Sequence, residues 1–445
     1  MMKKLSRFIK GVVFFLVIAG TCYAAQQNDA FILDFSIDEC QHYLMAEGFE
    51  NIQFSITQNR SLWVTYENRV FRNEMTALGI VLRYITEYFP FLEHYIIVPR
   101  HKDIPLVHFR VRRDDFVGYM IDEISSQEFV KRIQLSYSML DEHPIRGYRS
   151  KKVNSSVFKM DLRFAPGLRL QFARPNDPAQ MQFNALGNIS ATILNGLSLN
   201  GQWIAPIYNE FQSWEGKQRV GYLYLNQFLR LPHIGFMSLS AGLFDNQIYG
   251  ASGQVTRFMF DSRFALSLRM DYLDYGEHCF FNPYLGANPG NLKYVIMSQY
   301  NFQSVNFNTR LSWGVFSLGD RSWRLDLTRS FSELELGFMG IWNESQGFLT
   351  GMNVKIPFPV SRHPMPGRGR IHVPRSIRWS YRYLPQYHGY LTQSGVDICN
   401  VYDQFSRSFM IHNIGKIKSA LKYVHLHHLK KIERYAKGGT YEKSD

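Results

Sequence analysis

Alternation of apolar and polar residues, sustained for about two hundred residues after Val153, constrains this chain more than any other feature of its sequence. Between Phe264 and Tyr272 every second residue is apolar or aromatic, and the residues between them include Ser267, Arg269 and Asp271. Successive side chains of a β-strand point to opposite faces, so a period of two is typical of strands with one apolar face and one polar face. The sequence therefore predicts one large antiparallel sheet.

The length of the alternating runs distinguishes two kinds of sheet. Most runs span about 9 to 12 residues, the length of a tilted membrane-spanning strand, whereas strands of globular proteins are typically near five or six residues. Turn-forming residues separate the runs, at Pro166-Gly167, Asn195-Gly196, Leu231-Pro232-His233, Asp245-Asn246, Asp261-Ser262, Gly319-Asp320 and Ser345-Gln346-Gly347. We expect residues 151–360 to form an antiparallel outer-membrane-type β-barrel of about 12–14 strands. The alternative is a soluble β-sandwich whose aromatic residues fill a core between two sheets.

Composition excludes two other classes of protein. Hydrophobic residues make up 45% of the chain and aromatic residues 15%, which is too many for a disordered chain. The sequence has one long apolar run, at its N-terminus, so it is not a polytopic helical membrane protein. In a barrel, aromatic residues at strand ends would form interfacial girdles, and the candidates are Trp203, Tyr222, Tyr224, Tyr272, Tyr275, Tyr300, Trp313, Trp323 and Trp342.

The N-terminus has the pattern of a secretory signal. Lys3, Lys4, Arg7 and Lys10 precede the apolar stretch from Gly11 to Gly20, and small residues near Ala24 would permit cleavage there. We predict a signal peptide over residues 1–24, and lipidation of Cys22 is the less favoured alternative. Removal of four positive charges changes the net charge from +13 to +9. A basic exported chain fits polyanionic envelope components such as acidic glycans, or simply a solvated charged surface.

Two segments outside the alternating region have other patterns. Residues 25–150 are predicted to form a periplasmic α+β module, with helices over Ile37 to Glu47 and after the capping residue Asn73, and hairpins near residues 51–66 and 95–111. The strands are expected to end near Phe358. Residues 361–445 read as a basic Pro/Arg-rich segment followed by a helix from Ile411 to Tyr435.

Cysteines and histidines do not predict a metal site or a disulfide framework. Cys40, Cys279 and Cys399 are far apart in the mature chain, and at least one of them is expected to be buried and free. His425, His427 and His428 lie close together, but lysines surround them and no acidic ligand is near, so a solvated basic helix is the favoured interpretation. We predict no metal and no cofactor.

No catalytic motif is present in the sequence. Carboxylates such as Asp161, Asp261, Asp271 and Asp326 could form a glycosidase pair only at a suitable separation, and they are more often polar-face residues of strands. Glu67-Asn68-Arg69 is interpreted as an exposed turn whose ion pair has a small structural role. No catalytic residue and no individual binding residue is therefore nominated, and the chain is not expected to be an enzyme.

Several segments resemble the YjbH family of exopolysaccharide and group 4 capsule outer-membrane proteins. They are Gly48 to Arg72, Ile96 to Val111, Gly196 to Phe211, Leu239 to Phe258 and Trp323 to Pro359. The resemblance implies a non-catalytic outer-membrane β-barrel, with its N-terminal module in the periplasm, that assists export or assembly of a surface exopolysaccharide or capsule. It also implies outer-membrane lipid, the exopolysaccharide and other proteins of a polysaccharide export locus as partners, and no nucleic acid. An exported β-rich carbohydrate-active enzyme or sugar-binding protein is the alternative.

Overall fold

The computed structural model describes residues 36–420, except for 58–60, 138–146, 173–178, 212, 246–247, 276–291, 317–320, 345–346, 365–366 and 384–393. Two sheets contain most of these residues, so the fold is mainly β, as the sequence predicts. Within the described ranges no helix is both long enough and apolar enough to cross a membrane. The predicted signal peptide lies outside the described residues.

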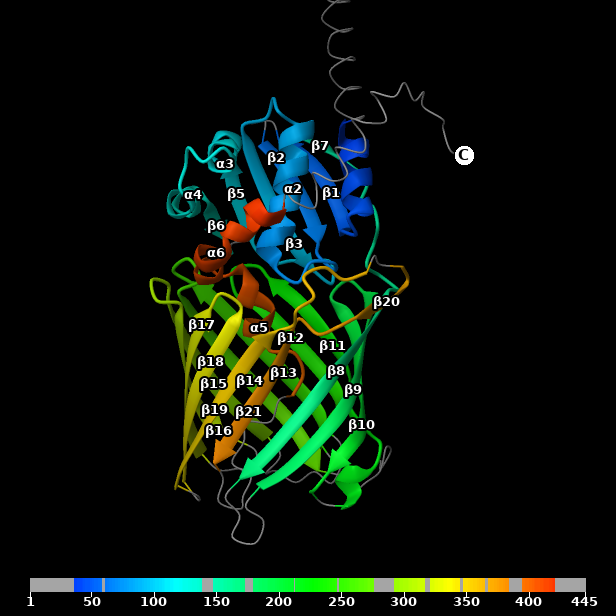
Figure 1. Cartoon of the computed structure of the whole chain (residues 1–445), viewed down its shortest axis with the longest axis vertical. Coiled ribbons are helices and arrows are strands. Elements are labelled where there is room, and N and C mark those ends of the chain that lie inside the picture. Colours follow the sequence, from blue (N-terminus) through cyan, green and yellow to red (C-terminus); the bar gives the residue numbers. More distant parts are fainter. Residues whose placement is uncertain are drawn as a thin grey trace, which may run out of the picture.

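The N-terminal module is a seven-stranded mixed sheet covered by helices (Figure 1). Its strand order is β6-β5-β3-β2-β1-β7, and the short β4 pairs with β3. The strands are β1 (Glu50–Thr57), β2 (Ser61–Glu67), β3 (His94–His101), β4 (Ile104–Pro105), β5 (His108–Arg112), β6 (Gln134–Ser136) and β7 (Gly147–Arg149). Residues 36–46 are helical, and the further helices are α2 (Glu74–Tyr88), α3 (Arg113–Met120) and α4 (Ser126–Arg132).

Local sequence explains the helices of the module. The side chain of Asn73 accepts a hydrogen bond from the backbone N–H of Met75 and so caps α2, as predicted. Gly48, which follows the first helix, has a φ of 93°, a left-handed conformation that glycine adopts without strain. Leu78 and Ile85 of α2 are fully buried in the core of the module. Burial of each such side chain is worth about 1.5–3 kcal/mol.

A fourteen-stranded sheet forms the rest of the fold. Its order is β20-β8-β9 and onward in chain order to β19, followed by β21. The long strands are β8 (Met160–Phe172), β9 (Ala179–Leu194), β10 (Leu197–Asn209), β11 (Arg219–Leu231), β12 (Gly235–Asp245), β13 (Ile248–Met259), β14 (Phe264–Tyr275), β15 (Leu292–Phe302), β16 (Phe307–Val315), β17 (Arg321–Phe331), β18 (Leu334–Asn343) and β19 (Gly347–Pro357). Each of them pairs antiparallel with the next.

The long sheet curls, and the module lies over one of its ends (Figure 1). Its last strand, β21 (Ser376–Tyr383), pairs with β19 and comes close to β8 at the opposite edge. The short β20 (Gly369–His372) pairs with β8 in parallel. The described pairings contain no ladder between β21 and β8, so closure into a barrel stays a prediction.

The polarity of the long sheet is the reverse of that in a globular protein. In β14 the polar side chains of Arg269 and Asp271 are 6% and 3% exposed, whereas Leu268 and Met270 are 46% and 50% exposed. The same division holds along β17, where Trp323 and Leu325 are exposed and Ser322 is buried. The predicted alternation is therefore correct, and the polar face is the enclosed one.

Two expectations for the alternating region, one turn and two girdle residues, are wrong. Pro166-Gly167 is not a turn but lies inside β8. Beyond Arg163 the described pairings bond β8 only to β9, and such an edge tolerates proline. Tyr222 and Tyr224 share the face of the buried Asn226 and not the outer face of a girdle.

The strands do not end near Phe358, because β21 continues the sheet to Tyr383. Its sequence, SIRWSYRY, alternates like the earlier strands, but its arginines suggested a basic segment. Part of the C-terminal helix is present as α6 (Arg407–Asn413) and residues 415–420, and the remainder of the predicted helix lies outside the described residues.

Candidate functional site

Residues 394–420, called the C-terminal segment, return to the enclosed polar face of the long sheet. They include α5 (Ile398–Tyr402), a short 3-10 helix (Asp403–Phe405) and α6, and they lie between the module and the sheet (Figure 1). Helix α5 contacts β12 and β13. The segment thus occupies the polar interior at the end covered by the module.

The first residues of the C-terminal segment make polar contacts with three strands, β13, β14 and β16. The carboxylate of Asp397 forms an ion pair with Arg310 of β16, with 3.0 Å between Nη1 and Oδ2, and accepts a hydrogen bond of 3.2 Å from Gln254 of β13. Asp397 also caps α5 by accepting from the backbone N–H of Cys399 at 3.0 Å. The hydroxyl of Ser394 accepts from Arg269 of β14, and Ser252 of β13 donates to the Ser394 carbonyl at 3.1 Å.

Aromatic contacts continue from the C-terminal segment to the module. The ring of Tyr402 lies 4.5 Å from that of Phe236 and 4.6 Å from that of Phe258, measured between centroids. Its hydroxyl donates to the carbonyl of Leu106 in the module at 3.2 Å. The hydroxyl of Tyr137, from the module, donates to the carbonyl of Phe405 at 2.8 Å. The segment therefore contacts both parts of the protein.

A buried network of charges joins the module to β8 and β20. Asp161 of β8 accepts from Arg370 at 2.6 Å, from His372 at 3.1 Å and from Arg69 at 3.3 Å. Glu50 of the module forms ion pairs with Arg370 and with Lys159, the latter at 3.0 Å. Buried side chains keep their charge when they are paired and hydrogen-bonded. This network meets that requirement at the junction, the contact region between the module and the long sheet.

Glu67-Asn68-Arg69 belongs to this network, and the expectation that it is exposed is wrong. Glu67 is 1% exposed and accepts from the backbone N–H groups of Lys102 at 2.7 Å and Asp103 at 3.2 Å. Arg69 lies 2.5 Å from Glu67. Burial acts to lower the pKa of Arg69, but the negative charges of Glu67 and Asp161 outweigh it and raise the pKa. The charge pair is evident in the sequence, but its position between the module and the long sheet is not.

Lys102, in the same network, is a buried cation. Burial, together with the neighbouring positive charges of Arg69 and Arg163, lowers the pKa of Lys102 to about 7. Its ammonium group contacts the hydroxyl of Ser198 on β10. The module therefore places a titratable group directly against the long sheet.

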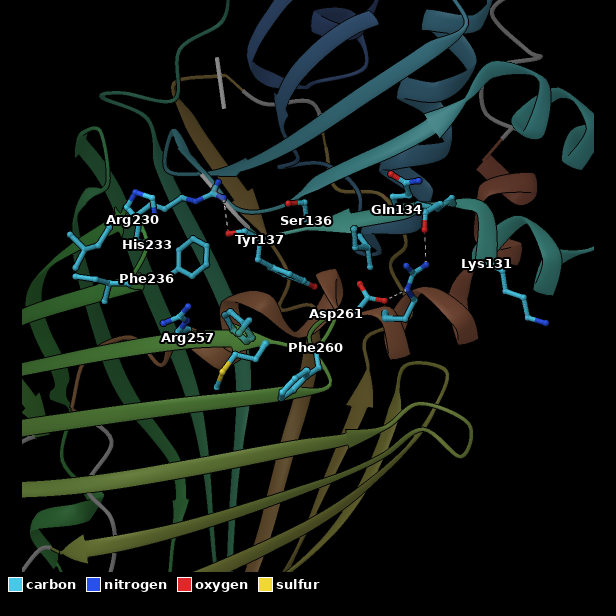
Figure 2. A pocket seen from close by; sticks show the side chains of 18 residues that line it. Lys131, Gln134, Ser136, Tyr137, Arg230, His233, Phe236, Arg257, Phe260 and Asp261 are labelled. Carbon is cyan, nitrogen blue, oxygen red and sulfur yellow. Dashed lines mark hydrogen bonds and ion pairs between the residues drawn. The ribbon is translucent and has the colours of Figure 1, made fainter. Parts of the chain in front are cut away.

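A second feature of the junction is a pocket of about 670 Å³ between the module and the hairpins β11–β12 and β13–β14 (Figure 2). Four cations and one carboxylate line it, giving a net charge of +3 with histidine neutral: Lys131, Arg230, Arg257, Arg407 and Asp261. Arg230 donates to the carbonyls of Pro105 and Tyr137, and Arg407 pairs with Asp261 at 2.7 Å. Phe260, 75% exposed, stands at the turn beside Asp261.

Each of the carboxylates considered for a glycosidase pair forms an ion pair with an arginine. Asp261 pairs with Arg407, Asp271 with Arg269 at 3.0 Å, and Asp326 with Arg324 at 2.8 Å. These pairs, and that of Asp161, match the structural interpretation of the four carboxylates. Cys40 and Cys399 are free and buried, as expected for at least one cysteine, and Cys279 lies outside the described residues.

In the part of the chain that the structure describes, no cluster of three or more His, Cys, Asp or Glu side chains could hold a metal ion. His425, His427 and His428 lie outside that part. No binding residue was predicted from the sequence, and Arg310, Gln254 and Asp397 were not recognised as candidates. Only the capping pattern at Asp397 was visible in the sequence, because their contact joins positions 87 residues apart.

Comparison with known proteins identifies a family for this chain but no individual curated relative. A search of the curated proteins finds no match to the chain. The family model described as "Exopolysaccharide biosynthesis protein YbjH" matches residues 21–362, which include the module and strands β8 to β19. Because this match spans well over half of the 445 residues, the chain belongs to the YjbH family of exopolysaccharide biosynthesis proteins.

Proposed function

We propose that this protein is a non-catalytic outer-membrane β-barrel that assists export or assembly of a surface exopolysaccharide or capsule. The observation that carries the proposal is the reversed polarity of the long sheet. Its outer face exposes Leu266, Leu268, Phe338, Trp342 and many similar side chains, and its inner face encloses serine, arginine and aspartate. Soluble monomers rarely expose apolar patches larger than a few hundred Å², whereas lipid-facing strands have this arrangement.

Strand length and the edges of the sheet support closure in a membrane. Strands β8 to β19 span 9 to 16 residues, and about 9 to 11 tilted residues cross the hydrocarbon core. An open sheet edge in lipid would leave backbone groups without partners, at a cost of several kcal/mol each. The proximity of β21 to β8 supports closure between these two strands.

The lengths of the connections support an orientation. Between β8 and β19 the connections at the module end span two to four residues, as at 195–196, 232–234 and 332–333, whereas at the other end 16 residues separate β14 from β15. The connection between β19 and β21, which contains β20, is the one long connection at the module end within the described part of the sheet. Outer-membrane barrels have short periplasmic turns and longer extracellular loops. The short connections support a periplasmic position of the module, which is consistent with the predicted signal peptide.

Family membership supports exopolysaccharide as the cargo, and the chemistry of the two sites supports contact with it. Arginines on the enclosed face and in the junction pocket can form charge-assisted hydrogen bonds, and exposed aromatic rings such as Phe260 can stack on sugars. The periplasmic module offers a surface for other proteins of the same export locus. Because the four candidate carboxylates are occupied by arginine, we favour this role over that of a carbohydrate-active enzyme.

Membrane fractionation with a heat-modifiability gel tests the proposal. We expect the protein in the outer-membrane fraction, with a gel mobility that changes on boiling, and we expect its deletion to reduce surface polysaccharide without general leakage of the envelope. A soluble protein whose mobility is unchanged by boiling would refute the barrel. Normal surface polysaccharide in the deletion strain would refute the role in export.

A further inference from the structure

We propose that the C-terminal segment is a removable plug, and that the polar groups it covers form a binding site for carboxylate groups of an acidic polysaccharide. In this proposal the Asp397 side chain occupies the position of a sugar carboxylate, such as that of a uronic acid. The inference rests on the proposed function, because it places the cargo inside the long sheet. The segment lies beyond residue 362, outside the residues that match the family model.

The charge balance of the enclosed face identifies Arg310 as an unusual residue. Two other arginines and a lysine of this face have carboxylate partners within the sheet: Arg269 has Asp271, Arg324 has Asp326, and Lys355 has Glu335 in addition to Asp403 of the C-terminal segment. Among the described residues, the ion pair of Arg310 is made with Asp397, which comes from the C-terminal segment.

Asp326 does not replace Asp397 as the partner of Arg310. It lies opposite Arg310 in the β16–β17 ladder, but its two oxygens accept from Arg324 at 2.8 Å each. A half-buried arginine without a carboxylate is costly, so the sheet requires an anion from elsewhere.

The groups around Asp397 are arranged to receive a carboxylate. Arg310 Nη1 and Gln254 Nε2 donate to its two different oxygens. The remaining edge of the Arg310 guanidinium donates to Oε1 of Gln299, at 3.0 Å from Nε and 2.8 Å from Nη2, and this contact fixes its orientation. Charge-assisted hydrogen bonds from a fixed arginine favour carboxylate ligands over neutral sugars.

The residues that bind the C-terminal segment explain why the segment and a glycan carboxylate would compete for the same site. Arg269 and Ser252, which hold Ser394, lie on β14 and β13 next to Gln254. A glycan carboxylate that takes the place of Asp397 meets this whole donor set. Binding of the cargo and release of residues 394–399 therefore become one exchange of equivalent ion pairs, which needs no covalent step.

Conductance and binding measurements on the full-length protein test the plug. In planar bilayers we expect Asp397→Asn and Arg310→Gln to raise the open fraction at least tenfold over wild type. Arg324→Gln is the matched control, because it removes an interior arginine whose described contacts do not include the plug. Wild-type conductance in Asp397→Asn and Arg310→Gln, with the native heat-modifiable form retained, would overturn the plug.

A cross-link tests the position of the plug without weakening it. The hydroxyl of Ser267 lies 3.9 Å from the sulfur of Cys399, which brings a Ser267→Cys side chain within reach of a disulfide with Cys399. We expect the oxidised Ser267→Cys, Asp397→Asn protein to be closed and to open again on reduction. Opening that is the same in both redox states, once a non-reducing gel confirms the disulfide, would contradict the proposal.

Binding of polygalacturonate to the detergent-solubilised protein tests the ligand class. Asp397→Asn should bind it at least tenfold more tightly than wild type, because the internal competitor is gone, and the further change Arg310→Gln should abolish that gain. Equal binding of neutral dextran, or a preference for polyphosphate, would overturn the carboxylate assignment. A protein that does not enter bilayers but passes this binding test would refute the membrane function and leave the carboxylate site standing.

Discussion

Replacement of Arg370 by methionine tests how the module is attached to the long sheet. Arg370 lies on β20 and is 2% exposed, between Asp161 of β8 and Glu50 of the module. Methionine retains much of the length and apolar surface of the side chain but cannot donate hydrogen bonds. The substitution therefore removes a charge from a buried network that spans two parts of the protein.

The magnitude follows from the partners that remain. Removal of one member of a buried ion pair typically costs about 3–5 kcal/mol, because the other charge stays buried. Asp161 keeps Arg69 at 3.3 Å, and Glu50 keeps Lys159 at 3.0 Å, so we expect the lower end, about 3 kcal/mol. That energy is about a hundredfold change in the equilibrium between the attached module and its detached or unfolded forms.

Urea titration of the purified protein in detergent, followed by limited proteolysis of the module, measures this change. Arg375→Met is the matched control, since it removes the same charge nearby, but Arg375 is half-exposed and 3.8 Å from Glu74, so we expect a loss of about 1 kcal/mol or less. A loss below about 1 kcal/mol for Arg370→Met, or equal losses for both variants, would show that the network does not hold the junction. Combining Arg370→Met with Asp161→Leu should recover part of the loss.

Three further predictions concern other parts of the molecule. Burial raises the pKa of Glu74 to about 7, so its contribution to stability falls as pH rises from about 4.5 to 7; Glu74→Gln should remove this slope and gain up to about 3 kcal/mol at pH 8. Urea midpoints at pH 5 and pH 8 measure it, and an unchanged slope would contradict it. Gly79→Ala should lower the melting temperature despite the better helix propensity of alanine, because the new Cβ would lie 2.9 Å from backbone atoms of Ile417; a higher melting temperature would count against this packing. If the long sheet is in lipid, Leu268→Arg should cost about 2–4 kcal/mol in urea unfolding from vesicles, and no loss would argue against a lipid-facing β14.

Local features of the sequence determined much of the fold. Alternation fixed which residues share a face, since side chains of a strand alternate whatever the strand is paired with. Asn73 and Gly48 marked helix ends because capping depends on residues a few positions apart. The mainly β fold and the family resemblance followed from these patterns. The strand β21 was missed because its arginines were interpreted as a basic segment, although its alternation was present.

The contacts that define the candidate site depended on the tertiary structure. Arg310 and Asp397 are 87 residues apart, and Glu50 and Arg370 are 320 apart. Periodicity states which face of a strand a side chain occupies, but not which distant segment meets that face. The sequence by itself therefore determined a two-faced sheet with arginines on its polar side. Only the curling of the sheet, which encloses that side and brings the C-terminal segment into it, decided which carboxylate each arginine receives, because a buried charge must find its partner across space.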